Sequence, residues 1–331
     1  MNYPKISIII PSYNQGNFIE EAIRSCLEQN CIHIELIIID GASTDTTLDI
    51  IKKYEHQIAY WISEPDNGQS DAINKGLKKV TGDIVTWLGC DDLLIKDTIK
   101  HVVDVFSSDP SINLVHGNTI YQYSDNHQVE SFVDEKGFPY KYLSGMAFAQ
   151  PSSFFRRSSL AEIGYLNESL HYGMDYDLML RLYDLGEVKH IDQFLSVYRV
   201  HEESKTSHSK VKFAEEWAQI FSKVVCSINP ESPLIKYLED LELYTKPLSL
   251  YRFKRDYAED FLYQSFLYFL NFQVIFLYQA PNVIKLRPIL KWLKKNEPEF
   301  FLQQQLENVY KRSFMLNDTL IRYARRVSAY L

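Results

Sequence analysis

An alternation of short apolar runs with amphipathic helical patterns, over the first 120 residues, most constrains how this chain can fold. The apolar runs are Ile6–Ile10, Ile34–Ile39, Ile58–Ile62, Ile84–Leu88 and Asn113–His116. Most are rich in Ile and Val with little polar alternation, which is typical of parallel strands covered on both faces. The alternation therefore predicts an α/β fold with a doubly wound, mostly parallel sheet and helices on both sides.

The helical patterns and the rest of the chain extend this expectation. Ile19 and Ile23 share one helix face, and Asn17 and Glu20 have the spacing of a capping box in front of them. Residues 119–160 carry shorter strands and loops, which predict a mixed or antiparallel extension of the sheet.

Beyond this extension the pattern becomes helical. A helix is expected from about Met174 to Leu185, then an alternating strand over Leu195–His201, and almost only helices from about Lys210. We therefore expect an α/β domain over residues 1–210 and a helical C-terminal region over residues 211–331. A chain of 331 residues is long enough for this arrangement.

The charge is unevenly distributed along the chain. Residues 241–331 hold 14 Lys and Arg against 8 Asp and Glu, whereas residues 1–240 hold 21 against 35. An acidic body argues against nucleic acid as a partner and suits a body that holds metal ions. The basic tail is suited to contact with something anionic.

The compartment is predicted from the cysteines and the first residues. No CxxC spacing occurs among the cysteines, which are Cys26, Cys31, Cys90 and Cys226. They are expected to be reduced thiols of a cytoplasmic protein. Residues 1–5 lead directly into an apolar strand pattern and do not resemble a signal peptide.

Acidic side chains follow several of the predicted strands. Asp40 follows the second run, Glu64–Asp71 follows the third, and Asp91 and Asp92 follow the fourth. The carboxyl ends of parallel strands meet at one edge of a sheet, where ligands bind in such folds. Gathered carboxylates repel one another unless a cation or a donor-rich ligand compensates them. Single acids such as Asp45 or Asp66 could instead cap helices.

Three segments carry a resemblance to a known family. Residues 6–14 (ISIIIPSYN), 38–47 (IIDGASTDTT) and 64–76 (EPDNGQSDAINKG) closely resemble the family 2 glycosyltransferases of GT-A fold. The resemblance runs from residue 4 to about residue 205, with the motifs in the family's order and spacing. It implies inverting transfer of a hexosyl or N-acetylhexosaminyl group from a nucleotide-diphosphate sugar, UDP-linked, to an acceptor hydroxyl.

The resemblance also implies roles in donor binding. Three residues of the loop after the first strand would line the nucleotide pocket: Pro11, Tyr13 and Asn14. Asp40 would accept a hydrogen bond from the base, and Asp71 would contact the nucleoside. For Asp71 the open alternative is an i,i+4 salt bridge with Lys75 on an exposed helix face.

Asp91 and Asp92 match the family's DxD region, which holds Mn²⁺ or Mg²⁺ against the donor diphosphate. Many relatives have a further Asp where this chain has Gly89, so which of the two carboxylates binds the ion stays open. They could alternatively be a pair of capping acids. His201 matches the His of a Tyr-Arg-x-His pattern near the metal in relatives, although a lone strand His is more often structural.

The acceptor side is implied by two further segments. Residues 173–182 match the family's acid-acid helix start, whose second acid is the catalytic base, and Met174 replaces the usual Glu. Asp177 and Arg181, spaced i,i+4, look like part of a solvated face, so we assign the base to Asp175, with an N-cap as the alternative. Gln150 would hold a hydroxyl of either sugar.

Residues 261–280 contain no charged side chain and are long enough to span a membrane. Scattered polar and many aromatic residues leave three interpretations open: buried packing, peripheral membrane contact and a true span. Downstream basic residues could meet anionic lipid: Lys285, Arg287, Lys291, Lys294 and Lys295. The expected location is cytoplasmic, with peripheral contact on the inner membrane face as an open alternative.

The expected setting is polysaccharide or lipid-linked glycan assembly, with a glycan or lipid-linked acceptor, and the oligomeric state stays open. Gly89 and Met174 also motivate a different class of function. A degenerate nucleotide-sugar-binding protein, acting as partner or regulator, would keep the fold without the chemistry.

Overall fold

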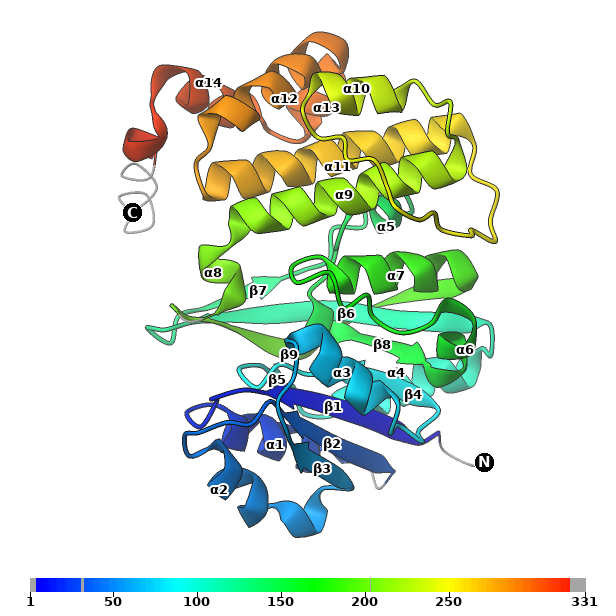
Figure 1. Ribbon diagram of the computed structural model, residues 1–331, viewed down its shortest axis with the longest axis vertical. Helices are drawn as coiled ribbons and strands as arrows, with labels where there is room; N and C mark the ends of the chain where they lie inside the picture. Colours follow the sequence, from blue (N-terminus) through cyan, green and yellow to red (C-terminus); the bar gives the residue numbers. More distant parts are fainter. Residues whose placement is uncertain (1–3, 31–32, 203, 322–331) are drawn as a thin grey trace. The chain divides into compact units, whose positions relative to one another are not determined.

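The computed structural model describes residues 4–30, 33–202 and 204–321 (Figure 1). The chain forms two compact units, one of residues 1–135 and 146–204 and the other of residues 136–145 and 205–331. The sequence predicts one boundary at residue 210, and it does not predict that residues 136–145 belong to the second unit.

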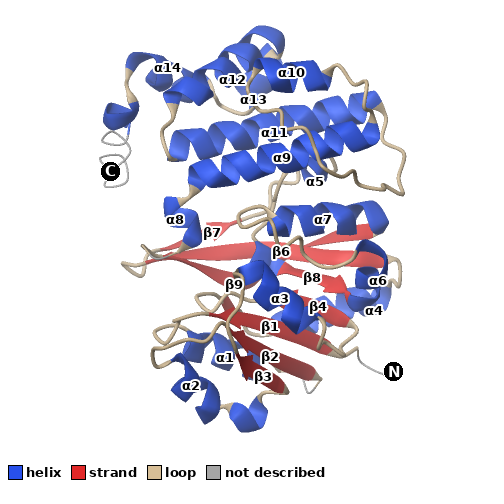
Figure 2. Ribbon diagram, in the orientation of Figure 1, coloured by secondary structure: helices blue, strands red, loops and turns tan. Residues whose placement is uncertain are grey.

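The first unit is built on one sheet, which has nine strands in the described part of the chain and is red in Figure 2. The strands are β1 (Ile6–Ser12), β2 (Ile34–Asp40), β3 (Tyr60–Ser63), β4 (Ile84–Trp87), β5 (Leu93–Leu94), β6 (Ile112–Tyr123), β7 (Gln128–Ser131), β8 (Ser153–Arg156) and β9 (Glu187–Val200). Their order is β3-β2-β1-β4-β8-β6-β9-β5, with β7 paired to β6 outside this path.

The sheet is parallel in its first half and mixed in its second. β3, β2, β1 and β4 are parallel neighbours, which confirms the parallel arrangement expected from the apolar runs. β8 then pairs antiparallel with both β4 and β6, and β6 pairs parallel with β9. This change matches the mixed extension that the sequence predicts after residue 119.

Helices cover both faces of the sheet (Figure 2). They are α1 (Ile19–Leu27), α2 (Thr47–Lys53), α3 (Gln69–Leu77), α4 (Thr98–Ser108), α6 (Leu160–Ile163) and α7 (Met174–Leu185). Ile8 of β1 belongs to the core that α1 and α4 complete, whereas the next residue, Ile9, packs on α3. Gly76 of α3 allows this approach, because a Cβ there would lie 2.6 Å from Ile9 Cγ2.

The predicted capping box in front of α1 is wrong. The helix begins at Ile19 after Phe18, and no side chain caps its first turn. The Glu20 carboxylate instead bonds Lys53 Nζ at 2.5 Å and the Tyr54 hydroxyl at 2.8 Å. This tertiary contact with α2 takes the acceptor that a capping box would have used.

A buried carboxylate joins β2 to β1 and to the turn before β4. Glu35 is 7% exposed and accepts hydrogen bonds from Lys5 Nζ at 2.7 Å, Ser7 Oγ, and the Thr81 amide at 2.7 Å. Burial of the carboxyl raises the pKa of Glu35, but these donors outweigh it and lower the pKa to about 2. The charged form of Glu35 therefore stabilises the folded state.

Glu35→Gln is expected to lower the free energy of unfolding at pH 7 by about 2 kcal/mol. Because the folded pKa is depressed, this stabilisation is complete above the ordinary pKa of 4.5 and is lost as the pH falls toward 2. Urea unfolding of the wild type and the variant at pH 7 and pH 3 measures it, and the gap should shrink by about half at pH 3. If the difference in unfolding free energy between the two proteins were the same at pH 7 and pH 3, the charge of Glu35 would not be its cause.

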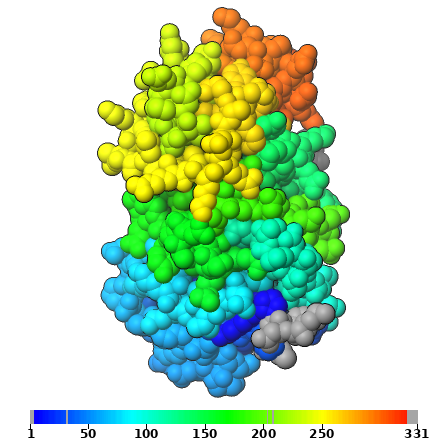
Figure 3. Space-filling view, turned by 90° about the vertical axis from the view of Figure 1, so that its right-hand side faces the viewer, coloured from blue at the N-terminus to red at the C-terminus, as the bar shows by residue number. Residues whose placement is uncertain are grey.

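The second unit is helical. Its helices are α5 (Lys141–Ser144), α8 (Lys205–His208), α9 (Lys210–Ile228), α10 (Leu234–Asp240), α11 (Glu259–Gln279), α12 (Val283–Asn296), α13 (Pro298–Gln303) and α14 (Glu307–Met315). Residues 241–258 depart from the predicted helical pattern and form an irregular connection between α10 and α11. Figure 3 shows the surface of this unit in yellow around residue 250 and in orange beyond it.

α11 is the core helix of this unit. Its buried side chains pack toward α9, α12 and α5, with the Phe269 ring stacked 4.3 Å from that of Phe221 on α9. Ser144 of α5 donates to the Ser265 carbonyl at 2.7 Å, which ties in the excursion from the middle of the chain. Within the described residues α11 is the one helix long and apolar enough to cross a membrane, and half of that stretch is buried. These contacts favour the interpretation of residues 261–280 as buried packing.

Candidate active site

The loops that follow β1, β2 and β4 lie at one edge of the sheet. Ser12, the last residue of β1, is in register with Asp40, the last residue of β2. Ile9 of β1 is in register with Trp87, which ends β4 just before the Gly89–Asp92 segment. The structure thus brings together the strand ends on which the sequence places its candidate residues.

Asp40 lies beneath this edge and is fully buried. Its carboxylate accepts hydrogen bonds from the Ser43 amide at 2.9 Å, the Ser43 hydroxyl and the Ser63 hydroxyl at 2.7 Å. The contact of Asp40 with the base stays a prediction. Asp40 fixes the loop after β2 to the end of β3.

The three residues predicted for the nucleotide pocket have different environments. Pro11 is buried, and its carbonyl accepts a hydrogen bond from the Cys90 thiol. Asn14 has a positive φ of 50°, its amide donates to Ser43 Oγ at 2.7 Å, and its side-chain oxygen accepts from the Thr44 amide at 2.9 Å. Tyr13 and Asn14 are both exposed, and 62% of Tyr13 is accessible to solvent.

Asp66 is a half-buried carboxylate at the same edge that sequence reasoning did not select. Its Oδ1 accepts from the Gly68 amide at 2.8 Å, but no side chain caps α3, so the capping role considered for Asp66 is wrong. Its Oδ2 approaches Gly41 so closely that a Cβ there would lie 2.5 Å away, and 3.4 Å from the Tyr13 ring. The absence of a side chain at Gly41 therefore lets the Asp66 carboxylate and the Tyr13 ring lie close to the backbone of the loop after β2. The signal that could have found Asp66 is its place in the strand-end segment 64–71.

Asp71, on the first turn of α3, forms the i,i+4 contact with Lys75 considered for it, and its predicted contact with the nucleoside stays a prediction. Its Oδ2 accepts from the Asn67 amide at 2.9 Å and lies 3.7 Å from Lys75 Nζ. Lys75 approaches Glu64 more closely, at 2.9 Å, so the i,i+4 pair is the weaker of its two ion pairs.

Asp91 and His201, 110 residues apart, meet at the end of β9. Nε2 of His201 lies 3.1 Å from Oδ2 of Asp91, and the imidazole stacks on the Phe18 ring at 4.6 Å. The neighbouring Asp92 is buried and accepts from the Arg199 amide at 3.1 Å. Burial, and then the negative charge of Asp91, raise the pKa of Asp92 well above its ordinary value.

The absence of a side chain at Gly89 lets these two carboxylates lie close to the backbone. A Cβ at position 89 would lie 2.7 Å from Asp91 Oδ1 and 3.0 Å from Asp92 Oδ2. In the described residues, no group of three or more His, Cys, Asp or Glu side chains is arranged to hold a metal ion, so the three predicted ligands do not form a protein-only site. Two converging carboxylates nevertheless fit a hard divalent cation whose other ligands are phosphate oxygens.

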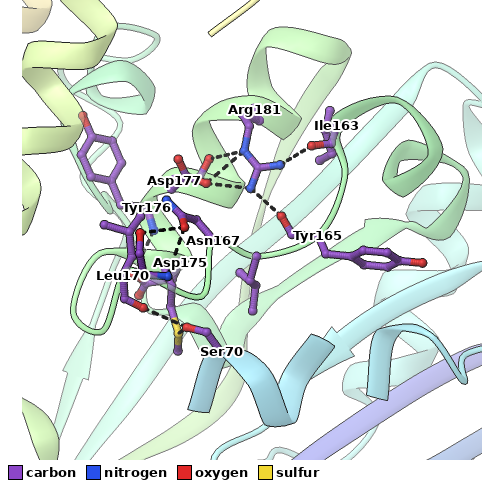
Figure 4. A network of polar contacts seen from close by, with 12 residues as sticks. Ser70, Ile163, Tyr165, Asn167, Leu170, Asp175, Tyr176, Asp177 and Arg181 are labelled. Carbon is purple, nitrogen blue, oxygen red and sulfur yellow. Dashed lines mark hydrogen bonds and ion pairs between the residues drawn. The ribbon is translucent and has the colours of Figure 1, made fainter. Parts of the chain in front are cut away.

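α7 begins at Met174, as the sequence predicts, and its first turn adjoins the first turn of α3 (Figure 4). Ser70 Oγ of α3 lies 2.8 Å from the buried Met174 sulfur and 2.9 Å from the Leu170 carbonyl. Asp71 and Asp175, the residues that follow, are therefore carried on adjoining helix ends. Asp175 is half-buried, and its Oδ1 accepts from the Tyr176 amide at 2.8 Å.

The prediction that Asp177 and Arg181 form a solvated face is wrong. Asp177 is 3% exposed and accepts from Nη2 of Arg181 at 2.7 Å (Figure 4). The guanidinium also donates to the carbonyls of Ile163 and Tyr165, which fixes α7 to the end of α6 and the segment that follows it. The i,i+4 spacing is thus real but structural, and the carboxylate of Asp177 is committed to it.

Gln150 lies after the segment 146–149 and reaches the end of β4. Its side-chain Nε2 donates to the Trp87 carbonyl at 2.8 Å, and its main-chain carbonyl accepts from Ser153 Oγ at 2.6 Å. The amide therefore supports the strand that leads into Asp91 and Asp92.

Known proteins resemble this chain in sequence and in fold. Residues 7–164 match the model of the family described as glycosyl transferase family 2. An uncharacterized glycosyltransferase of Rickettsia typhi is 25% identical over 88% of this chain and 97% of its own length. One from Haemophilus influenzae is 30% identical over 50% of this chain and 68% of its own length. A chondroitin synthase of Escherichia coli is 29% identical over 64% of this chain and 31% of its own length.

Solved structures show the same fold. TarS of S. aureus, residues 1–349 in complex with UDP-GlcNAc, aligns with a TM-score of 0.63 at 18% identity, over 97% of this chain and 87% of that one. A mannosyltransferase of Pyrobaculum calidifontis, in complex with GDP-Man and Mn²⁺, aligns with a TM-score of 0.55 at 18% identity, over 95% and 87%. The fold is that of the GT-A glycosyltransferases, and the chain belongs to glycosyl transferase family 2.

Proposed function

We propose that this glycosyltransferase moves a sugar from a UDP-linked donor to an acceptor hydroxyl with inversion at the anomeric carbon. The observation that carries the proposal is the 3.1 Å contact between His201 and Asp91 beside the buried Asp92. This contact joins the Asp91–Asp92 segment to His201 after β9, and both are predicted to lie near the donor diphosphate. The loops after β1 and β2 lie at the same edge of the sheet.

The donor half of the site would consist of side chains that contact the base and a pair of carboxylates for the diphosphate. Tyr13 and Asp66, which both lie close to Gly41, would contact the base, the first by stacking and the second as an acceptor for a base N–H. Asp91 and Asp92 would hold Mn²⁺ or Mg²⁺. When bound, such an ion stabilises the charge that develops on the leaving diphosphate.

The acceptor half would depend on Asp175. In a single displacement, the acceptor oxygen bonds to the anomeric carbon while the bond from that carbon to the phosphate oxygen breaks. The electron pair leaves with the nucleoside diphosphate, and the acceptor proton passes to the Asp175 carboxylate. Asp175 suits this role better than Asp177, because it is half-exposed whereas Asp177 is buried against Arg181.

Glycan is the acceptor class that the relatives favour. The similar E. coli protein is a chondroitin synthase and a similar Pasteurella multocida protein is a hyaluronan synthase. We extend this to the present chain as a proposal of glycan extension in polysaccharide or lipid-linked glycan assembly.

A donor panel tests the proposal. With Mn²⁺ present, the release of UDP is measured with UDP-GlcNAc, UDP-GalNAc, UDP-glucose and UDP-glucuronate, and the release of GDP with GDP-mannose. For at least one UDP sugar, UDP release should exceed GDP release at least about tenfold. The Asp175→Asn variant is the control that measures nucleotide release by contaminating enzymes. Equal or greater GDP release would overturn the UDP assignment. Tight UDP-sugar binding without turnover on any donor or added glycan would instead favour a nucleotide-sugar-binding partner protein.

A further inference from the structure

The outer surface of α12 and α14 is basic and carries two protruding apolar side chains. The structure describes every residue of both helices. Those with exposed side chains are Ile284, Pro288, Lys291, Lys294, Lys295 and Asn296 on α12, and Asn308, Lys311, Arg312 and Met315 on α14. Half of them are Lys or Arg and none is Asp or Glu, so this surface is positive within a protein whose net charge is −8.

Several of the exposed residues of each helix share one line along it. On α12, Ile284, Lys291 and Lys295 follow the spacing i, i+7, i+11, with the buried Leu286 and Leu290 on the other side. On α14, Lys311 and Met315 follow the spacing i, i+4. Each line therefore combines an apolar tip with basic residues one to three turns away. Ile284 and Met315 are 80% and 81% exposed, far more than side chains that pack against a neighbouring helix.

Contacts between the two helices make the two lines parts of one surface. Arg287 of α12 donates to the Ser313 and Leu316 carbonyls at 2.8 and 3.3 Å. Lys291 places its ammonium 5.3 Å from the centre of the Phe314 ring, so an exposed residue of α12 covers the residue before Met315. The Val283 amide donates to Asp318 at 3.0 Å, next to Ile284.

Some of the basic residues that the sequence predicts to meet lipid form contacts within the helical unit instead. Arg287 serves the carbonyls of α14, Lys285 pairs with Glu215 at 3.1 Å, and Lys294 pairs with Glu307 at 3.1 Å. The charges presented outward are then chiefly those of Lys291, Lys295, Lys311 and Arg312. Glu299 on α13 is an exposed acid in the same part of the chain.

We propose that this surface, formed by the exposed residues of α12 and α14, lies on an anionic lipid bilayer. Apolar tips flanked by basic side chains are the features by which interfacial helices bind lipid: the tips enter the boundary between headgroups and acyl chains, and the bases pair with the headgroups. α11 is less suited to this contact, because half of its apolar stretch is buried in the core of the unit. The proposal is independent of the sugar and the nucleotide.

Vesicle co-sedimentation of the full chain tests this proposal. Wild-type protein should pellet with vesicles of phosphatidylcholine and phosphatidylglycerol at 7:3 at least about tenfold more strongly than with pure phosphatidylcholine, and less at 0.5 M than at 0.1 M NaCl. Ile284→Asp/Met315→Asp and Lys291→Glu/Lys311→Glu should each weaken binding at least about tenfold.

Leu248→Asp is the matched control, because Leu248 is a fully exposed leucine in the irregular connection of the same unit. It should bind like the wild type, and circular dichroism melting should show all variants folded. Equal binding of the wild type to charged and neutral vesicles, or an equal loss in the Leu248 variant, would overturn the proposal. So would binding to an acidic polymer such as heparin without binding to the charged vesicles, since that result would indicate a soluble anionic partner.

Discussion

Asp175→Asn is expected to reduce sugar transfer by about 10³-fold while leaving binding of the donor nucleotide unchanged. The amide keeps the size of the side chain but cannot take a proton, and general-base catalysis contributes roughly 10²- to 10⁴-fold. The Oδ1 that accepts from the Tyr176 amide remains an acceptor in Asn, so the start of α7 should be preserved. Single-turnover transfer and calorimetric titration with UDP together separate the two effects.

Asp177→Asn on the same helix is the matched control. It weakens a buried ion pair and should lower the free energy of unfolding by about 3 kcal/mol, with near-normal turnover of the molecules that remain folded. The base assignment would be wrong if Asp175→Asn kept near-normal turnover. It would move to Asp177 if that variant, folded and able to bind UDP, lost transfer instead.

Chelation of divalent cations is expected to lower transfer by more than about 10²-fold, and added Mn²⁺ should restore it. Asp91→Asn should raise the Mn²⁺ concentration needed for half-maximal activity at least about tenfold, because an amide oxygen is a weaker ligand than a carboxylate. Mn²⁺ binding with UDP present, followed by electron paramagnetic resonance, gives a readout that does not depend on turnover.

Asp104→Asn, which alters an exposed carboxylate on α4, controls for a general effect of lost negative charge. It should leave the Mn²⁺ dependence as in the wild type. Full activity in EDTA, or the same Mn²⁺ dependence in the Asp91 and wild-type proteins, would show that the Asp91–Asp92 pair has a different role.

The sequence predicts the sheet well where the hydrophobic pattern is strong. The Ile-rich runs that start at Ile6, Ile34 and Ile84 begin where β1, β2 and β4 begin, since a covered parallel strand has to be apolar throughout. The same rule underestimates β6 and β9. β6 continues past its predicted end over Gly117–Tyr123, and β9 begins before its predicted start, over Glu187–Phe194. In both ranges polar residues are mixed with apolar ones, and most of them pair in the ladder.

Side-chain environments were harder to predict, because they depend on contacts distant in sequence. Asp40 follows a strand like a ligand-binding acid, yet Ser63 from another strand and Ser43 from its own loop take its oxygens. Asp177 and Arg181 have the spacing of a surface pair, but the carbonyls of Ile163 and Tyr165 make that position interior. No local pattern contains the distant partner, so none could predict the burial.

The hydrogen bonds that join the loops after β1 and β2 also bear on the entropy of ligand binding. Asn14, Ser43, Asp40 and Ser63 form an unbroken chain from the first loop to the end of β3. The conformational entropy of these loops is thus lost when the protein folds, and a nucleotide would meet a floor already in place. What remains to be ordered there is the exposed Tyr13 ring, so donor affinity should respond to its mobility more than to that of the backbone beneath it.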